Sequence, residues 1–491
     1  MQGKKTHQEK LFIQFQLSDY VPADNFYRRL KSLLDLDFLY QSTLKHYGKE
    51  GQKSIDPVVF MKLMLVGYLE NITSERRIIA TAGMRMDILY FLGYDLGEEL
   101  PWHSTLSRTR KLYGQESFLA VFQQVLKLCI DKGLISGKRQ AVDSALIPAN
   151  ASMHSMVERL VMEDASVFSR ELTQNSEDGP IAPPPEKPEE GSKGGQDKRA
   201  PRANPTHYSL SDPDARLTTK PGKPMNLYYR SQLSVDTASH FITYIQAFKG
   251  NEADNDSLPV ILSRIAGNMG GNVVREILAD SGYSSGKAIR ALIARDIEGY
   301  IPNPGNYKPS RENEGFTYDS ENDRYTCVNG AKLPFKRIEA SYKNPAILKK
   351  IYASNTSECK SCPFKHECAN AKGYKKLVDT IDKELYEYMR KRVESAKGKR
   401  MKRLRSATVE PVFGSLINYT GLKRINTKGL KQANKCMLMA ATAYNLKKLL
   451  KYNFKPLKKA QTQLINSLNS LANNIVTQFK QQYDISLLSS F

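Results

Sequence analysis

The sequence predicts a mixed α/β protein with an all-helical N-terminal region. Apolar residues recur at helical spacing up to about residue 135, and strand-like alternation replaces this period from about residue 138. Helical spacing returns after about residue 380. At 491 residues the chain can bury more than one core, so we expect roughly two to four domains.

Residues 15–135 are predicted to be helical. The stretch 55–69 carries apolar residues at helical spacing, behind a Ser54 cap and an early Pro57. Residues 100–113 indicate a turn followed by a short basic helix. Several short helices ending in a basic one are typical of a helix-turn-helix DNA-binding domain, although a plain helical bundle with a solvated basic face fits equally well. The basic helix offers three candidate DNA contacts: Arg108, Arg110 and Lys111.

Residues 138–302 are predicted to form the first part of a sheet domain. Alternating apolar residues predict five strands, at 139–149, 228–236, 241–248, 273–279 and 299–302. Helices are expected at 257–266 and 285–296. Residues 171–225 are poor in apolar side chains, so we expect a disordered or loosely packed insertion there. An antiparallel hairpin with parallel additions is compatible with a ribonuclease-H-like mixed sheet, whose acidic residues gather at one edge.

Three further segments complete the chain. Residues 303–380 are predicted to be a cysteine-containing insertion, and residues 381–455 the helical remainder of the sheet domain, which carries Glu410. The tail at 456–491 is predicted to be helical, because apolar residues recur at spacings of four and three in Leu464, Leu468, Leu471 and Ile475. Either a short coiled-coil contact or packing of the tail on its own domain fits that pattern.

Three acidic residues lie at the edges of apolar runs: Asp143, Asp280 and Glu410. A carboxylate that ends a strand-like run faces outward at the edge of a sheet, and three such groups converging would form an oxygen-ligand site suited to Mg²⁺ or Mn²⁺. Each residue also has a simpler interpretation. The two aspartates could cap turns, and Glu410 could be a first-turn helix carboxylate beside Pro411.

The chain is strongly basic, with 73 Lys and Arg against 51 Asp and Glu and a formal net charge of +22. This excess favours nucleic acid or an anionic membrane as a partner. No run of 18 or more apolar residues appears and the N-terminus lacks a secretory signal, so we expect a cytosolic protein that binds nucleic acid and no membrane. Basic runs flank Glu410 and offer candidate phosphate contacts, although such runs are ordinarily solvated faces: Arg400, Lys402, Arg403, Arg405, Lys423 and Arg424.

Four of the six cysteines lie in the segment 303–380: Cys327, Cys359, Cys362 and Cys368. The last three have the spacing Cys-x2-Cys-x5-Cys, and four thiolates are the ligand set of a structural Zn²⁺ site. Cys359 and Cys362 form one Cys-x2-Cys pair, but the second pair of such a site is represented only by Cys327, with Cys368 completing the set. Reduced thiols, with His366 as a surface residue, are therefore the alternative interpretation.

The ordered strings around these residues resemble the DDE transposases of bacterial insertion sequences, in particular the IS-eleven-eighty-two-like group. The matching strings are 142–145, 211–216, 278–283, 409–414 and 443–446, and the resemblance covers about residues 15–455. It implies a ribonuclease-H-like catalytic domain in which Asp143, Asp280 and Glu410 hold two Mg²⁺ or Mn²⁺ ions. It also implies hydrolysis and strand transfer on double-stranded DNA, with element terminal repeats and target DNA as substrates. A homodimer or larger assembly on DNA, in a bacterial cytoplasm at the nucleoid, is expected.

The sequence departs from the Tyr-x2-Arg-x3-Glu-x6-Lys signature of related families. Arg403, Ser406 and Ile417 stand where that signature has tyrosine, arginine and lysine. We expect Arg405 and Lys423 to supply phosphate contacts instead. Two other functions stay open: a ribonuclease-H-like nuclease without strand transfer, and a catalytically decayed DNA-binding regulator.

Overall fold

The computed structural model describes residues 15–48, 50, 54–158, 203–255, 257–305, 307, 314–341, 344–360, 362–364, 368 and 373–453. The chain divides into two compact units, the first comprising residues 1–113 and 442–491 and the second residues 114–441. Within the described ranges, no helix is long and apolar enough to cross a membrane. The predicted tail at 456–491, with its leucine pattern, lies outside the described residues.

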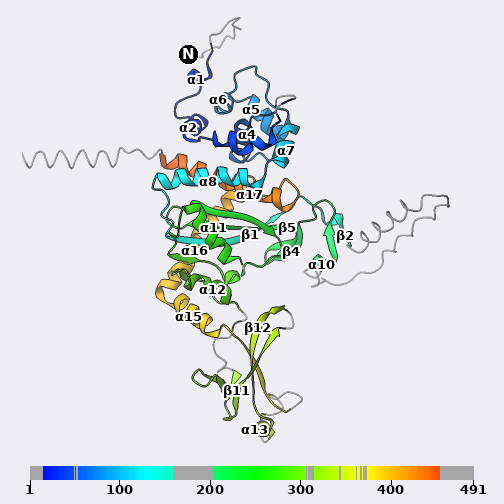
Figure 1. Ribbon diagram of the computed structural model, residues 1–491, viewed down its shortest axis with the longest axis vertical. Helices are drawn as coiled ribbons and strands as arrows, with labels where there is room; N and C mark the ends of the chain where they lie inside the picture. Colours follow the sequence, from blue (N-terminus) through cyan, green and yellow to red (C-terminus); the bar gives the residue numbers. More distant parts are fainter. Residues whose placement is uncertain are drawn as a thin grey trace, which may run out of the picture. The chain divides into compact units, whose positions relative to one another are not determined.

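The first unit is built from short helices (Figure 1). These are α1 (Leu17–Tyr20), α2 (Phe26–Leu33), α3 (Phe38–Thr43), η1 (Leu44–His46), α4 (Pro57–Leu69), α5 (Glu75–Gly83), α6 (Met86–Leu92) and α7 (His103–Leu112). Helix α4 is buried along nearly its whole length and forms the centre of the unit. Its cap is Asp56, which accepts hydrogen bonds from the backbone N–H groups of Val58 and Val59 at 2.7 and 3.0 Å. The predicted Ser54 cap was wrong, because Pro57 occupies the first helical position and leaves the preceding residue to cap.

The first unit ends earlier in the chain than the predicted helical region. Helix α8 (Gln115–Asp131) belongs to the second unit. It contacts α11 (Leu258–Met269), and Gln123 donates a hydrogen bond to Asn268 at 2.9 Å. The helical spacing of apolar residues continues past residue 113 without a break. The sequence pattern therefore could not show that α8 belongs with the sheet and not with the preceding helices.

A six-stranded mixed sheet forms the framework of the second unit. Its strands are β1 (Arg139–Pro148), β4 (Arg216–Lys220), β5 (Lys223–Asp236), β6 (Ile242–Lys249), β7 (Glu276–Leu278) and β8 (Glu298–Tyr300). The order is β4-β5-β1-β7-β8, with β6 also paired to β5. Strand β5 is antiparallel to β1, β4 and β6, whereas β7 is parallel to both β1 and β8. Each of the five predicted strands is present, and the antiparallel hairpin with parallel additions is confirmed.

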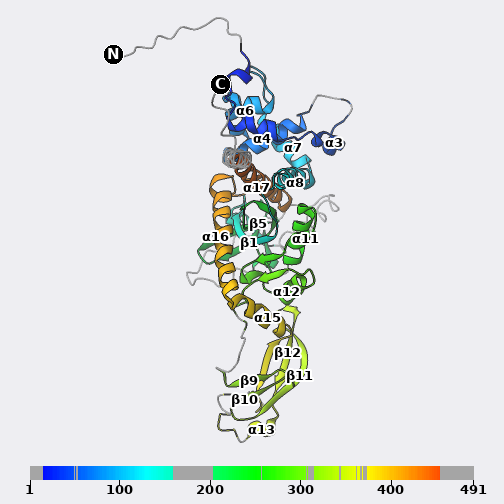
Figure 2. The ribbon, with the colours of Figure 1, turned by 90° about the vertical axis from the view of Figure 1, so that its left-hand side faces the viewer.

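Helices lie on both faces of this sheet (Figure 2). Helices α11, α12 (Gly286–Ile293) and α15 (Lys383–Glu394) share a buried apolar cluster with β1 and β7. Helix α16 (Ala396–Tyr419) lies on the opposite face and contacts β1, β7 and β8. Helix α17 (Leu430–Asn453) follows it in the chain, and its residues from Thr442 onwards belong to the first unit.

Glu410 lies in the interior of α16, so its interpretation as a first-turn carboxylate is wrong. Ser395 caps the start of the helix, and its hydroxyl accepts a hydrogen bond from the N–H of Gly398 at 3.0 Å. It continues through Pro411, which lies inside the helix. Proline there leaves one carbonyl of the preceding turn without its usual backbone donor, yet the helix does not end.

Part of the predicted loose insertion is ordered. Residues 203–225 form α10 (Ala203–Thr206), β3 (His207–Ser209), β4 and the start of β5, and β3 pairs with β2 (Met156–Glu158), which follows η2 (Met153–Ser155). The polar residues of this stretch bond within the protein. The buried amide of Asn204 both donates to and accepts from the backbone of Leu217, at 2.7 and 2.9 Å. The prediction of a loose insertion is therefore wrong for residues 203–225, where polar side chains form internal hydrogen bonds. Residues 171–202 lie outside the described residues.

A separate five-stranded antiparallel sheet arises from the segment predicted as an insertion. Its strands are β9 (Phe316–Asp319), β10 (Arg324–Cys327), β11 (Lys332–Ser341), β12 (Asn344–Ala353) and β13 (Lys376–Thr380), in the order β13-β12-β11-β10-β9. Helix α13 (Thr356–Lys360) lies between the last two strands in the chain. This sheet has its own small apolar cluster: Phe316, Tyr325, Leu333, Tyr352 and Leu377.

Candidate active site

Asp143 lies in the interior of β1, beyond the part of that strand that pairs with β7. It does not end its strand as we expected. Its carboxylate accepts a hydrogen bond from Nη1 of Arg405 on α16 at 2.5 Å, and both side chains are largely buried. Burial raises the pKa of Asp143 above its ordinary value; Arg405 opposes this rise, and nearby Asp280 adds to it. A desolvated carboxylate thus shares its surroundings with a second acidic group and a cation.

Asp280 follows the end of β7 and lies near enough to Asp143 for its charge to raise the pKa of Asp143. Strands β1 and β7 are parallel, and Ala141 is the register partner of Leu278. Asp143 and Asp280 each lie two residues further along, and side chains two residues apart share a face of a sheet. Asp280 also caps η4 (Ser281–Tyr283), accepting from the N–H of Gly282 at 3.0 Å. The turn-capping interpretation is therefore correct for Asp280, and it is compatible with a place beside Asp143.

A third aspartate, which sequence analysis missed, lies close to this pair. Asp254 is buried and accepts hydrogen bonds from Arg230 at 2.5 Å and from Ser144 and Gln232, each at 2.8 Å. A Cβ atom on Gly282 would lie 3.0 Å from an oxygen of Asp280 and 3.6 Å from an oxygen of Asp254. Both carboxylates therefore border the same glycine. Asp254 falls in a polar loop without periodicity, so no sequence pattern singled it out.

The buried phenol of Tyr283 lies near enough to all three aspartates for their charges to affect its pKa. Its side chain is fully buried, and burial is the main cause that raises its pKa well above the ordinary value. The charges of Asp254, Asp143 and Asp280 each raise it further. One side chain thus lies within electrostatic reach of three acidic groups that are 137 residues apart at most in sequence.

Glu410 does not join the two aspartates in a ready ligand set. Its side chain is exposed, and it follows Arg405 on α16 by five residues, which is about 140° around an α-helix. Arg405 is thus the residue of α16 that meets Asp143. Among the described residues, no group of three or more His, Cys, Asp or Glu side chains could hold a metal ion as it stands. The predicted convergence of all three acids is therefore seen only for Asp143 and Asp280.

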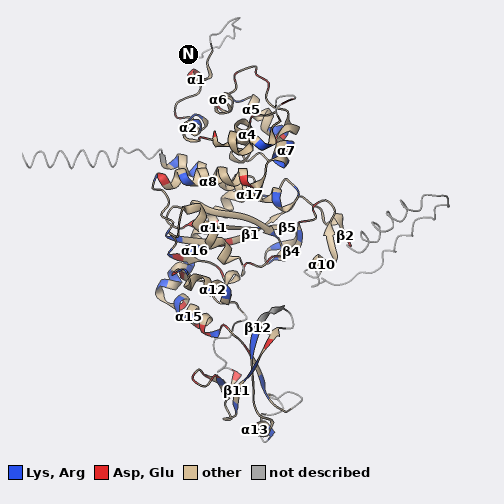
Figure 3. Ribbon diagram, in the orientation of Figure 1, with Lys and Arg blue, Asp and Glu red and all other residues tan. Residues whose placement is uncertain are grey.

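Seven of the nine predicted DNA-binding residues are exposed, and basic residues recur along α7 and α16 (Figure 3). Arg108 and Lys111 lie on α7, Arg400, Lys402 and Arg403 lie in the first half of α16, and Lys423 and Arg424 follow that helix. Nε of Arg424 also donates to the carbonyl of Ala149 at 3.1 Å.

The remaining two cations have internal partners. Arg405 is bound to Asp143. Arg110 is buried on the inner face of α7 with Leu106 and forms a salt bridge with Glu75. In this structure both arginines, predicted as DNA contacts, are therefore engaged inside the protein. Arginine can be buried when it is paired, and a basic run in the sequence does not distinguish that role from a solvated one.

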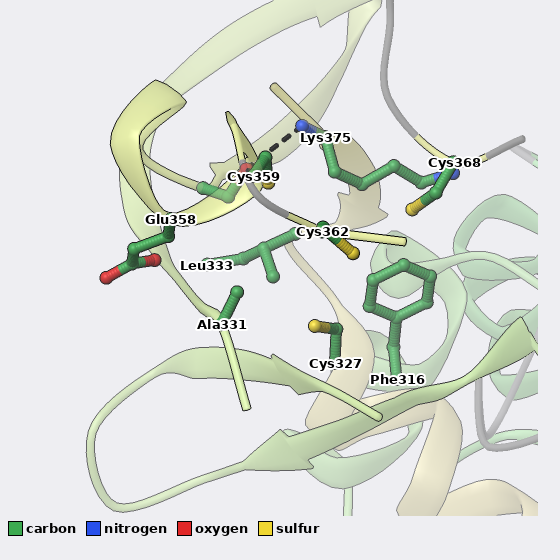
Figure 4. Close-up of a pocket in the computed structure, with 10 residues that line it drawn as sticks. Phe316, Cys327, Ala331, Leu333, Glu358, Cys359, Cys362, Cys368 and Lys375 are labelled. Carbon is green, nitrogen blue, oxygen red and sulfur yellow. Dashed lines mark hydrogen bonds between the residues drawn. The ribbon is translucent and has the colours of Figure 1, made fainter. Parts of the chain in front are cut away.

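The four predicted zinc ligands also come together. Cys327, Cys359, Cys362 and Cys368 line one small cavity, whereas His366 lies outside the described residues (Figure 4). All four are free thiols.

Two parts of the chain match known family models. Residues 15–112 match a model described as "Transposase domain (DUF772)", and residues 326–450 match one described as "Transposase DDE domain". The second match includes Glu410 and Arg405. No curated protein matches the chain. A solved structure titled "Cryo-EM structure of piggyBac transposase synaptic complex with hairpin DNA" aligns over 95% of this chain and 82% of that chain, at 12% identity and a TM-score of 0.31.

Proposed function

We propose that this chain, whose two domain matches indicate a DNA transposase of the DDE type, binds the terminal inverted repeats of its own insertion sequence and catalyses their cleavage and strand transfer. One observation supports the proposal most. Ala141 on β1 pairs in parallel register with Leu278 on β7, two residues before Asp143 and Asp280, and the charge of Asp280 raises the pKa of Asp143. The sheet order, with an antiparallel hairpin on one side of β1 and parallel strands on the other, supports a ribonuclease-H-like catalytic domain.

The two aspartates fit a hard divalent cation. Carboxylate oxygens are the ligands that Mg²⁺ and Mn²⁺ prefer, and Asp143 already accepts a cationic group in this structure. Like charges at Asp143 and Asp280 repel each other, which is why Asp280 raises the pKa of Asp143. Asp143 and Asp280 would hold the metal, and Glu410, which is exposed on α16 in this structure, would have to move towards them to become the third ligand. A pair of such ions supplies activation of a water or 3′-hydroxyl and stabilisation of the leaving oxygen.

Arg405 has two roles in the proposal. In the described structure its guanidinium neutralises Asp143 within a largely buried site. With a metal bound by Asp143, the guanidinium of Arg405 would no longer be needed to neutralise that carboxylate. A DNA phosphate is the natural acceptor, since the planar guanidinium fork matches phosphate oxygens. Arg405 would thus contact DNA only after the metal binds.

The exposed basic residues would contact DNA by its phosphates. Arg108 and Lys111 lie on the helical unit, and Arg400, Lys402, Arg403, Lys423 and Arg424 lie on or just after α16. Such contacts position a duplex without reading its sequence. Because two element ends must be paired before transfer, a homodimer or larger assembly on DNA is part of the proposal.

Incubation of the protein with labelled terminal-repeat DNA, target DNA and Mg²⁺ tests the function. Joined products support a transposase, cut products alone support a nuclease, and a gel shift alone supports a DNA-binding regulator. The same assay on Asp143→Asn tests the site, and its matched control is Asp382→Asn. Asp382 accepts a hydrogen bond from Arg290 at 2.6 Å, so it is also an Arg-paired aspartate, but it lies outside the proposed site. This variant is expected to join DNA as the wild type does.

A further inference from the structure

The four cysteines of the second sheet surround one cavity although they come from separate elements. Cys327 ends β10, Cys359 lies in α13, and Cys362 and Cys368 follow that helix. Figure 4 shows the four thiols arranged around the cavity, with the ring of Phe316 and the side chain of Lys375 beside them. The pairing of strands does not by itself bring the four thiols together, because only Cys327 belongs to a strand.

The cavity has room for a single ion. Its volume is about 20 Å³, whereas one water-sized sphere needs about 10–15 Å³ and pockets for organic ligands are about 300–1,000 Å³. An organic metabolite or organic cofactor therefore does not fit there. We propose that Cys327, Cys359, Cys362 and Cys368 bind one structural Zn²⁺ ion, an inference independent of the proposed DNA chemistry. Four cysteine sulfurs are a standard tetrahedral zinc set.

Hydrogen-bond donors already lie against two of the sulfur atoms. The amide of Asn329 donates to Sγ of Cys362 at 3.6 Å. Oγ of Ser354 lies 3.0 Å from Sγ of Cys359, and the same oxygen accepts from the N–H of Lys375 at 3.0 Å, which leaves its own proton for the sulfur. Donors of this kind stabilise metal-bound thiolates and fix their orientation.

Lys375 provides a cation beside the same cavity. It lines the cavity, and its Nζ lies 5.4 Å from the centre of the Phe316 ring. A zinc ion with four thiolates carries a net charge of −2, so a nearby ammonium group favours the charged cluster over neutral thiols. Zinc binding would release the four thiol protons to the buffer.

The small core of this sheet explains what the ion would contribute. Its apolar cluster has five buried residues, with Cys327 and Cys368 packed against them. Small cores are commonly supplemented by a metal or by disulfides. Because the described residues hold no closed set of three metal ligands, binding must draw the sulfurs inward. The ion would then tie β10 to α13 and to the segment that follows it.

Metal analysis of the full-length protein, purified without chelator and supplied with Zn²⁺, tests the site. We expect one equivalent of zinc in the wild type and far less than one in Cys362→Ser. The matched control is Cys436→Ser, since Cys436 is buried elsewhere and its sulfur lies within hydrogen-bond distance of Asn426 and Thr427, which suit a serine hydroxyl. This control should retain one equivalent. Zinc well below one equivalent in the wild type, or unchanged in Cys362→Ser, would overturn the proposal.

A second measurement needs no variant and so does not depend on a variant's folding. Co²⁺ bound in place of Zn²⁺ should produce intense thiolate-to-metal absorption, and chelation should expose four additional thiols to alkylation. Absence of both changes in the wild type would also overturn the site.

Discussion

Arg405 donates a hydrogen bond of 2.5 Å to Asp143 although the two residues are 262 positions apart in the sequence. The pair joins α16 to β1 at the point where Asp280 adds a second carboxylate. Under the proposed function, the guanidinium supplies Asp143 with the positive charge that a bound metal cation would otherwise provide. A bound metal should therefore offset part of the stability that is lost when Arg405 is removed.

Arg405→Ala should destabilise the metal-free protein by about 1–3 kcal/mol, because it leaves a largely buried carboxylate without its partner. The deficit should shrink in excess Mg²⁺ or Mn²⁺, since the ion replaces the lost charge. Denaturant unfolding with and without metal measures both effects. The control is Arg324→Ala, which removes a more exposed ion pair with Asp319 and should cost less at every metal concentration. An equal deficit with and without metal would contradict the proposed role of Arg405.

Asp254→Asn should lower stability by roughly 2–4 kcal/mol while leaving Mn²⁺ affinity nearly unchanged. The carboxylate of Asp254 is already bonded to Arg230, Ser144 and Gln232, so it has a structural role and loses a buried ion pair on substitution. Unfolding experiments and calorimetric titration with Mn²⁺ measure the two quantities. A large loss of Mn²⁺ affinity in a folded variant would instead make Asp254 a ligand.

The two kinds of basic residue on α7 should respond differently to substitution. Arg108→Ala and Lys111→Ala each remove an exposed cation, and each should reduce the slope of log affinity for DNA against log salt by about 1. Arg110→Ala should leave that slope unchanged and lower the melting temperature, because it breaks the buried pair with Glu75. DNA-binding isotherms at several salt concentrations, with thermal unfolding, distinguish the two. Slopes unchanged in Arg108→Ala and Lys111→Ala would exclude α7 from the interface.

Stability should fall below pH 4.5 partly through Glu298. Hydrogen bonds from Lys397 and Tyr300 lower the pKa of Glu298 from 4.5 to about 2. A lowered carboxyl pKa gives stability that is present above the unfolded-state value and is lost as pH falls towards the folded-state value. Lys397 bridges Glu298 and Glu276, both at 2.7 Å, so Lys397→Ala should flatten this part of the stability profile. Lys399→Ala, an exposed lysine of the same helix outside this cluster, should not. Identical profiles for the two variants would rule out this linkage.

Local patterns predicted most of the sheet, because strand periodicity and turn residues are properties of short segments. They placed β1, β5, β6, β7 and β8, and therefore the neighbourhood of Asp143 and Asp280. The meeting of the two aspartates depends on the parallel register of β1 with β7, which a sequence pattern can suggest but not fix.

The sequence could not predict the roles of residues that depend on partners far away in the chain. Arg110 and Arg405 look like other basic residues until Glu75 and Asp143 are seen beside them. Asp254 lies in a loop without periodicity, and its importance comes from three donors on β1 and β5. Residues 203–225 are polar, yet their polar groups bond to one another and to the sheet.

Cleavage of terminal-repeat DNA by Asp143→Asn, measured with Mn²⁺ affinity of the same protein, tests the central claim most directly. Asparagine preserves the shape of the side chain and removes its charge. We predict a folded protein that still binds DNA, but whose cleavage rate falls by at least about 10³-fold and whose Mn²⁺ affinity falls with it. Cleavage near the wild-type rate would contradict the claim that Asp143 and Asp280 hold the metal that cuts DNA.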